Sequence, residues 1–317
     1  MKKIVFLIAA LLLIFLLIGP YLIPLPTQPD LSADAVAPGT GRFLTVDGVR
    51  TYIQDIGPRE APAVMLIHGF GGSTYSWRET LPFLAANGYR AIALDLKGYG
   101  LSDKNFAEDY TLASQAEFVA GVMDEVGVGS ATIVGHSMGA GVVGHFAALY
   151  PDRVDNLVFV DGAPSTADGD EGLNFLSYLV RFPPIRQWAR FIMRWQLDEE
   201  AVAERLRSAY YNPDFVTEEI ESNYLAPQRI KDWELALLGI MRDSGENNLA
   251  APVQDYTSAP ALIIWGEEDT WVPLSSGNAF AESMPDAEYV IIPDSGHLPM
   301  EEQAELFNAT LLEFLRR

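Results

Sequence analysis

The chain has 317 residues, of which 49% are hydrophobic, and a formal net charge of −22. It contains no cysteine, which excludes disulfide bonds, thiol catalysis and cysteine-ligated zinc, and its four histidines are too scattered for a metal site. The strong negative charge argues against nucleic acid as a partner, because phosphate binding needs a basic surface. We therefore expect neither a metal nor another cofactor.

The N-terminal segment is apolar. Two lysines precede an uncharged run from Ile4 to Leu25, and about 20 apolar residues can cross a bilayer. We expect a transmembrane anchor over residues 1–26, with a helix that ends early at Pro20 or Pro24. Because positive residues stay on the cytoplasmic side, the remaining chain would face outward.

A cleaved signal peptide is the alternative for this segment. Ala33, Ala35 and Ala37 have the small-residue spacing of a cleavage site, and cleavage would give a secreted protein. Residues 27–41 are rich in proline, alanine and aspartate and have no periodicity, which predicts a linker.

From residue 42 the chain alternates between apolar β-branched runs and segments with helical periodicity. Asp47-Gly48 between two short runs indicates a β-hairpin. The strands are predicted at residues 43–46, 49–53, 63–67, 91–94, 131–134, 154–160, 261–265 and 287–292. This alternation predicts an α/β fold, a mostly parallel sheet flanked by helices, formed by residues 42–162 and 257–317.

One strand runs into the sequence Gly135-His136-Ser137-Met138-Gly139, and an alanine- and glycine-rich helical segment follows. The two glycines allow a sharp turn between strand and helix, which would present the Ser137 hydroxyl clear of the sheet. A five-residue pattern is weak evidence by itself, since a tight turn with an incidental serine has the same sequence.

Three further loops follow predicted strands at the edge where open α/β sheets place their sites. The first is His68-Gly69-Phe70-Gly71, the second contains Asp269, and the third contains His297. A serine hydroxyl needs a neighbouring base to act as a nucleophile, and a histidine oriented by a carboxylate supplies one.

These loops together resemble the α/β-hydrolase fold family. The segment around Ser137 is similar to the nucleophile elbow of that family, and the chain order Ser137, Asp269, His297 is also its order. The resemblance implies a triad of Ser137 as nucleophile, His297 as base and Asp269 as acid, with an oxyanion hole formed by the backbone N–H groups of Phe70 and Met138. The residues expected to support these loops are His68, Gly69, Gly71, Gly135 and Gly139.

Other assignments compete with this one. Asp161 follows the preceding strand and is an alternative triad acid, whereas Glu267 and Glu268 come too early in their loop. We expect His136 and His145 to be packing residues.

Residues 163–256 interrupt the alternation and are helical in character. They lie after the sixth strand, where the resemblance implies a helical cap over the active site. Arg181, Arg186, Arg190 and Arg194 recur here among large aromatic residues. They form either a basic membrane-surface face or partners for the acidic core, with the aromatic residues lining a pocket. We favour the second interpretation.

The resemblance also limits the chemistry. A serine nucleophile argues against haloalkane dehalogenases and soluble epoxide hydrolases, which use aspartate. The C–C bond hydrolases of the family usually carry asparagine before the serine and tryptophan after the histidine, where this chain has His136 and Leu298.

We therefore predict a serine carboxylesterase or lipase that cleaves hydrophobic esters, such as acyl lipids, and is tethered to the outer face of a membrane. A C–C hydrolase, an aminopeptidase and a non-catalytic receptor for a small ligand are the alternatives.

Overall fold

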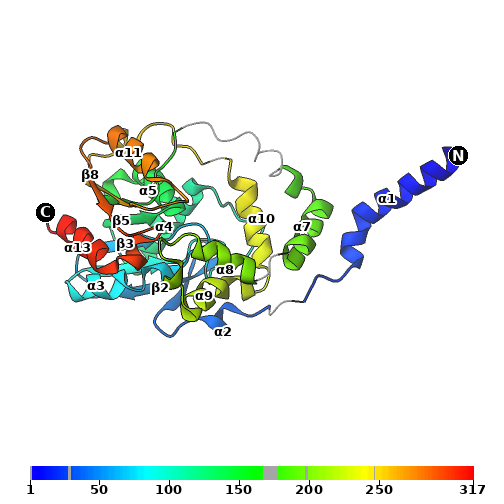
Figure 1. Cartoon of the computed structure of the whole chain (residues 1–317), viewed down its shortest axis with the longest axis horizontal. Coiled ribbons are helices and arrows are strands. Elements are labelled where there is room, and N and C mark those ends of the chain that lie inside the picture. Colours follow the sequence, from blue (N-terminus) through cyan, green and yellow to red (C-terminus); the bar gives the residue numbers. More distant parts are fainter. Residues whose placement is uncertain (1, 28–29, 167–177, 197–198, 246) are drawn as a thin grey trace.

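The structure, a computed structural model, describes residues 2–27, 30–166, 178–196, 199–245 and 247–317. A single body contains the sheet and its helices, and one long helix, α1 (Lys2–Leu22), extends away from it (Figure 1). The C-terminus lies at the opposite end of the molecule from α1.

An eight-stranded sheet forms the centre of the body, with strand order β1-β2-β4-β3-β5-β6-β7-β8. The first two pairings, β1 with β2 and β2 with β4, are antiparallel, and the others are parallel. The strands are β1 (Arg42–Val46), β2 (Val49–Ile56), β3 (Ala63–Ile67), β4 (Arg90–Leu94), β5 (Ala131–His136), β6 (Val154–Val160), β7 (Ala261–Gly266) and β8 (Glu288–Ile292). Every residue of β3, β4, β5 and β7 is buried, as expected for parallel strands covered on both faces.

Helices cover both faces of the sheet. Buried side chains of α4 and α5 pack in one hydrophobic cluster, and those of α3 and α13 pack in another on the other face. The helices of this part are α3 (Thr80–Ala86), α4 (Leu112–Val126), α5 (Met138–Leu149), α11 (Leu274–Ser283), α12 (Pro299–Glu302) and α13 (Ala304–Leu315). The predicted mostly parallel α/β sheet is confirmed.

The predicted helical cap is also confirmed, since the helices between β6 and β7 lie outside the sheet layers (Figure 1). They are α7 (Pro183–Gln196), α8 (Glu199–Arg207), α9 (Glu218–Leu225) and α10 (Trp233–Asp243). Part of the predicted cap, residues 167–177, lies outside the described residues.

Two arginines of the cap turn inward. Arg190 and Arg194 both form ion pairs with Glu234 of α10, which is fully buried, at 2.7 and 2.9 Å. Arg194 also reaches Asp30, and the guanidinium of Arg186 lies over the ring of Phe106. The favoured interpretation paired these arginines with the acidic core and placed the aromatic residues on a pocket wall. Arg190 and Arg194 do pair with acids, but the partners are Glu234 of the cap and Asp30 of the linker, so these two arginines do not form a basic membrane face. The aromatic half of the interpretation is wrong for Trp195 of the same helix, which is 71% exposed.

The N-terminal segment differs from the prediction at two points. Helix α1 continues through Pro20 and ends at Leu22, two residues before Pro24, so the predicted early end is confirmed at Pro24 and wrong at Pro20. The predicted linker contains a short helix, α2 (Ala33–Val36), and it rests on the body, where Leu31 pairs with Ile230 and Asp34 forms an ion pair with Arg50.

The turn between β5 and α5 depends on Gly135. A Cβ atom at this position would lie 2.3 Å from the carbonyl oxygen of Gly139. We expect Gly135→Ala to lower the free energy of unfolding by about 1–3 kcal/mol, as overpacked sites do. Urea unfolding checks this against Gly129→Ala, whose new Cβ would meet nothing within 4 Å. Equal stabilities of the two variants would contradict the argument.

Candidate active site

The candidate nucleophile, Ser137, occupies a strained turn. It lies between the last residue of β5 and the first residue of α5, with φ 52° and ψ −118°, a region that non-glycine residues rarely adopt. Its backbone N–H donates to the carbonyl of Val160 on β6 at 2.8 Å. The neighbouring strand therefore helps to hold the serine at the carboxyl edge of the sheet.

Ser137, His297 and Asp269 form one chain of hydrogen bonds. His297 Nε2 lies 2.9 Å from Ser137 Oγ, and His297 Nδ1 lies 2.7 Å from Asp269 Oδ2. The other carboxylate oxygen, Asp269 Oδ1, accepts the backbone N–H groups of Trp271 and Val272. Asp269 and His297 are both buried. The two backbone N–H groups hold Asp269 in place through Oδ1, and its Oδ2 orients the imidazole of His297. In this arrangement His297 Nδ1 is the donor, and Nε2 can accept the proton of the serine hydroxyl.

The loop that carries His297 is held by several contacts. His136 Nε2 donates to the His297 carbonyl at 2.6 Å, and the His297 backbone N–H donates to Ala209 of the cap at 2.7 Å. Burial, with the neighbouring His297, lowers the pKa of His136 well below its ordinary value. His136 is therefore a neutral donor that positions the loop, which gives its predicted packing role a specific partner.

Glu302 joins the same loop to the cap, and the sequence analysis missed it. Its carboxylate accepts the backbone N–H groups of Gly296, Tyr211 and Asn212 at 2.7–3.0 Å. A carboxylate three residues beyond Pro299 carries no local signal of this role, because two of its three partners lie about ninety residues away in the chain.

The glycine-rich loop after β3 lies against Ser137. A Cβ atom at Gly69 would come within 2.9 Å of the Ser137 Cβ, so glycine permits this approach. His68 is buried and structural: Nδ1 donates to the Gly69 carbonyl, Nε2 accepts the Leu96 N–H, and burial lowers its pKa to about 4. Gly71, with φ 73°, lies on the wall of the adjoining cavity.

The two expected oxyanion donors, Phe70 and Met138, come from the loop after β3 and from the start of α5. Phe70 lines the same cavity as His297, and Met138 is the first residue of α5, where N–H groups have no acceptor within the helix. This placement suits an oxyanion hole.

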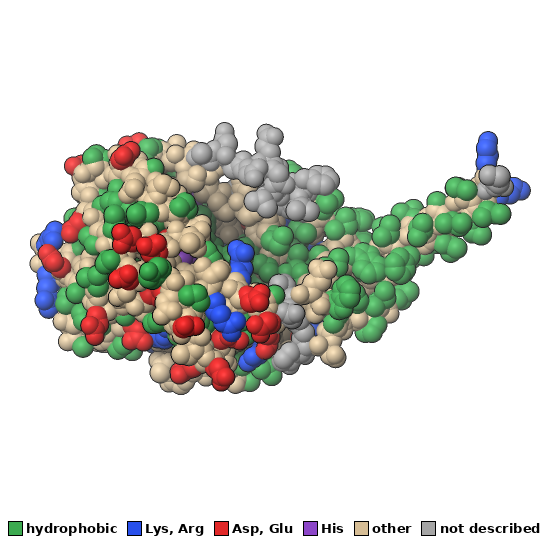
Figure 2. All heavy atoms as spheres, viewed as in Figure 1, with side chains coloured by type: hydrophobic (Ala, Val, Ile, Leu, Met, Phe, Trp, Pro, Cys, Tyr) green, Lys and Arg blue, Asp and Glu red, His purple; other side chains and the backbone are tan. Residues whose placement is uncertain are grey.

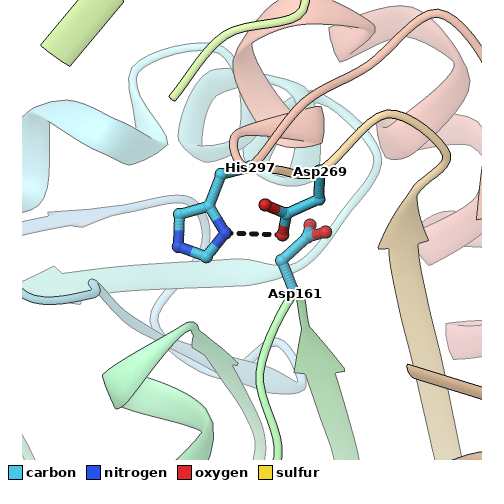
Figure 3. A group of neighbouring side chains, drawn as sticks. All are labelled: Asp161, Asp269 and His297. Atoms are coloured by element: carbon cyan, nitrogen blue, oxygen red, sulfur yellow. Dashed lines mark hydrogen bonds and ion pairs between the residues drawn. The ribbon is translucent and has the colours of Figure 1, made fainter. Parts of the chain in front are cut away.

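Asp161, the alternative acid, lies beside Asp269 without replacing it. The three groups Asp161, Asp269 and His297 bring donor atoms within 4.8 Å of one another, and the hydrogen bond from the imidazole goes to Asp269 (Figure 3). Asp161 Oδ1 instead accepts the Gly266 N–H at 2.7 Å. Burial, together with the charge of Asp269, raises the pKa of Asp161 well above its ordinary value. A protonated Asp161 is a poor metal ligand, although two carboxylates and an imidazole this close have the residue types of a cation site.

The raised pKa of Asp161 predicts a pH effect on stability. The folded state retains this proton at pH values where the unfolded chain has lost it, so the stability contribution falls as pH rises above about 4. Asp161→Asn keeps an acceptor for Gly266 and cannot ionise, and it should gain stability over the natural chain as pH rises from about 4 to about 7. Urea unfolding at both pH values measures this, with Asp155→Asn on the exposed part of β6 as the control. A difference that stays constant with pH would contradict it.

A cavity of about 260 Å³ opens beside His297, between the sheet edge and the cap. Its walls are mainly apolar and include Trp271, whose ring centre is 5.4 Å from that of His297. The other cap and loop residues on its walls include Val202, Arg205, Leu206, Tyr224, Gln228, Trp233, Leu237 and Leu298. Among the described residues lining it there is no aspartate or glutamate, so no acid there could bind a free amino group, and the aminopeptidase alternative gains no support.

Arg205 gives this cavity a positive charge that the sequence analysis did not assign. Its guanidinium lies 4.9 Å from the ring centre of Trp271, the residue that also contacts His297. The site therefore combines an apolar volume with one guanidinium, which suits a hydrophobic substrate that carries an anionic group.

Comparison with known proteins places this geometry in a family. Residues 62–304 match the alpha/beta hydrolase fold family. A 2-hydroxy-6-oxononadienedioate/2-hydroxy-6-oxononatrienedioate hydrolase from Burkholderia vietnamiensis is 30% identical over 295 residues, covering 88% of this chain and 96% of that protein. The chain belongs to the α/β hydrolase fold family, and it is a serine hydrolase of that fold.

Two solved structures show the same fold. The meta-cleavage product hydrolase CumD from Pseudomonas fluorescens is 29% identical, with a TM-score of 0.66, covering 87% of this chain and 98% of that chain. A membrane phospholipase A, a bacterial virulence factor, is 22% identical with a TM-score of 0.69, covering 100% of this chain and 98% of that chain. The second likeness concerns the fold alone, and its aligned length includes the N-terminal helix.

Proposed function

We propose that the chain is a membrane-anchored serine hydrolase that cleaves carboxylic esters of hydrophobic acyl groups. The observation that carries the proposal is the hydrogen-bond chain from Ser137 through His297 to Asp269 at the wall of an apolar cavity. A serine, a histidine and an aspartate linked in this way catalyse acyl transfer, and an apolar cavity accommodates an acyl group.

Acylation would begin with transfer of the Ser137 hydroxyl proton to His297 Nε2 as Oγ attacks the ester carbonyl carbon. Asp269 stabilises the imidazolium, and the N–H groups of Phe70 and Met138 bind the negative oxygen of the tetrahedral intermediate. His297 then protonates the departing alcohol. A water molecule activated by the same imidazole attacks the acyl-enzyme, which releases the carboxylic acid and restores the serine.

Membrane anchoring is proposed from helix α1. It has 21 residues with a mean hydropathy of 2.8, and most of its side chains are exposed. This is expected of a helix whose side chains contact lipid and not a protein core. The proposed orientation places Lys2 and Lys3 in the cytoplasm and the catalytic body outside. A cleaved signal peptide is the alternative for this helix.

C–C bond hydrolysis next to a ketone is the second candidate, and the curated relatives support it more strongly than they support ester hydrolysis. The relative from B. vietnamiensis and the CumD structure are both named for this chemistry. Arg205 in the cavity would suit a carboxylate on such a substrate. What supports the ester candidate is local: His136 and Leu298 depart from the residues usual in C–C hydrolases, and Leu298 lines the cavity.

Parallel assays of the full chain in detergent separate the two candidates. One arm uses p-nitrophenyl esters of increasing chain length, and the other uses 2-hydroxy-6-oxo-6-phenylhexa-2,4-dienoate. We expect kcat/KM for the preferred ester to exceed that for the dienoate by about 100-fold or more, since specificity is a ratio of these constants. The opposite ratio would reject the ester candidate in favour of C–C cleavage, and Ser137→Ala controls for background hydrolysis in both arms.

A further inference from the structure

Helix α7 has two faces of opposite character. Trp188, Phe191, Ile192 and Trp195 follow the i, i+3, i+4, i+7 spacing and share one face, while the arginines lie on the other. Trp195 is 71% exposed and Ile192 is 46% exposed. The arginine face is occupied by the ion pairs with Glu234, so the aromatic face is the one that points away from the body.

The aromatic face adjoins the proposed membrane helix. The rings of Trp188 and Phe15 are 5.3 Å apart between centroids, and Trp188 Nε1 donates to the carbonyl oxygen of Leu16 at 3.0 Å. Figure 2 shows the hydrophobic surface of α1 continuing onto the adjoining part of the body.

The acceptor in this bond is an unusual one. Within an α-helix the carbonyl of Leu16 would accept the N–H of residue 20, but that residue is Pro20, which has none. A backbone carbonyl without a partner is costly in the hydrocarbon region of a bilayer. The indole N–H of Trp188 therefore satisfies the one carbonyl that the proline leaves free, and this fixes where α7 meets α1.

The contact also sets the depth of α7. Leu16 lies six residues before the end of α1, which corresponds to about 9 Å along the helix axis. Helices that lie in the membrane interface bury their apolar face to about 5–10 Å. If α1 crosses a bilayer, α7 meets it inside the leaflet nearest the body.

We propose that α7 is an interfacial helix whose aromatic face inserts into the lipid leaflet beside α1, with the Trp188–Leu16 bond as its fixed point. The inference rests on the membrane anchoring proposed above. Because Arg190 and Arg194 tie α7 to Glu234 of α10, and Trp233 and Leu237 of α10 line the cavity, the cap would hold the active-site cavity close to the leaflet.

Site-directed spin labelling of the full chain in phosphatidylcholine nanodiscs tests this, and the absence of native cysteines makes single-cysteine variants straightforward. Nitroxides are placed at Ile192→Cys, at Leu12→Cys on α1, and at the control Leu306→Cys on α13, which is exposed at the far end of the molecule. Collisions with oxygen report lipid, and collisions with a water-soluble nickel chelate report solvent. We expect oxygen-dominated collisions at residues 12 and 192 and nickel-dominated collisions at residue 306.

The possible outcomes distinguish the interfacial role of α7 from the membrane anchoring of α1. Lipid contact at residue 12 with solvent contact at residue 192 overturns the interfacial role of α7 and leaves the anchor intact. An immobilised label at residue 192 that neither reagent reaches also overturns it, and shows that a second protein surface, such as another copy of the chain, covers the face. Solvent contact at residue 12 overturns the anchor itself.

The hydrogen bond between Trp188 and the Leu16 carbonyl is tested separately in the Ile192→Cys background. Trp188→Phe keeps a ring and removes the N–H, while Pro20→Ala supplies an N–H inside the helix that competes for the Leu16 carbonyl. We expect each change to raise nickel accessibility at residue 192, and the double variant to raise it no further than the larger single effect, because both break one bond. Unchanged accessibility in Trp188→Phe would overturn the role of this bond.

Discussion

Ser137→Ala should lower kcat by about 10⁴–10⁶-fold on whichever substrate the enzyme prefers, because it removes the atom that forms the acyl-enzyme. The fold should persist, since the backbone N–H of residue 137 still reaches the Val160 carbonyl. Steady-state turnover measures the loss, and circular dichroism checks the fold.

Ser283→Ala, on the exposed end of α11, is the matched control and should keep natural activity. Turnover by Ser137→Ala within about 10-fold of the natural chain would show that another group is the nucleophile, given the losses usual for such variants.

Asp269→Asn should lower kcat by about 10⁴-fold with little change in KM. The amide can present a donor to His297 Nδ1, which favours the tautomer whose Nε2 carries the proton and cannot accept one from Ser137. Asp161 does not restore the activity, because its Oδ1 is engaged by Gly266 and its raised pKa keeps the carboxyl neutral.

Two further variants serve as controls for Asp269→Asn. Glu268→Gln, an exposed neighbour in the same loop, should be active. Asp161→Asn should stay within about 10-fold of the natural kcat, far from the loss typical of a missing triad acid. If instead Asp161→Asn were inactive and Asp269→Asn were active, the acid would be Asp161.

The sheet and the order of the site loops could be predicted because local patterns determine them. Short, continuous apolar runs such as 63–67 and 261–265, rich in β-branched residues, favour buried strands, and parallel strands bring their carboxyl ends to one edge. Ser137, Asp269 and His297 each follow a parallel strand of this sheet, so their proximity follows from topology.

The contacts of the cap could not be predicted in the same way. The sequence places Arg190 and Arg194 on one helix face, but whether that face meets lipid or protein depends on Glu234, forty or more residues away. The bond from Trp188 to Leu16 spans 172 residues, and Glu302 joins the His297 loop to the cap over about ninety. Helical spacing determines which residues share a face, whereas tertiary packing determines which partner that face meets.

The continuation of α1 through Pro20 has a similar cause. Proline predicts the end of a helix when the freed carbonyl must find water, but here the indole of Trp188 binds that carbonyl. A partner from a distant element thus replaces the hydrogen bond that the proline removes, which is one part of the penalty behind the local rule.

Covalent labelling of the full chain with a fluorophosphonate tests the central claim most directly. The reagent phosphonylates a serine only where a base and an oxyanion site activate it. We predict one adduct per chain, located by peptide mass spectrometry on Ser137, and no adduct in Ser137→Ala. An unlabelled natural chain, or an adduct that persists in Ser137→Ala, would contradict the assignment of Ser137 as the nucleophile.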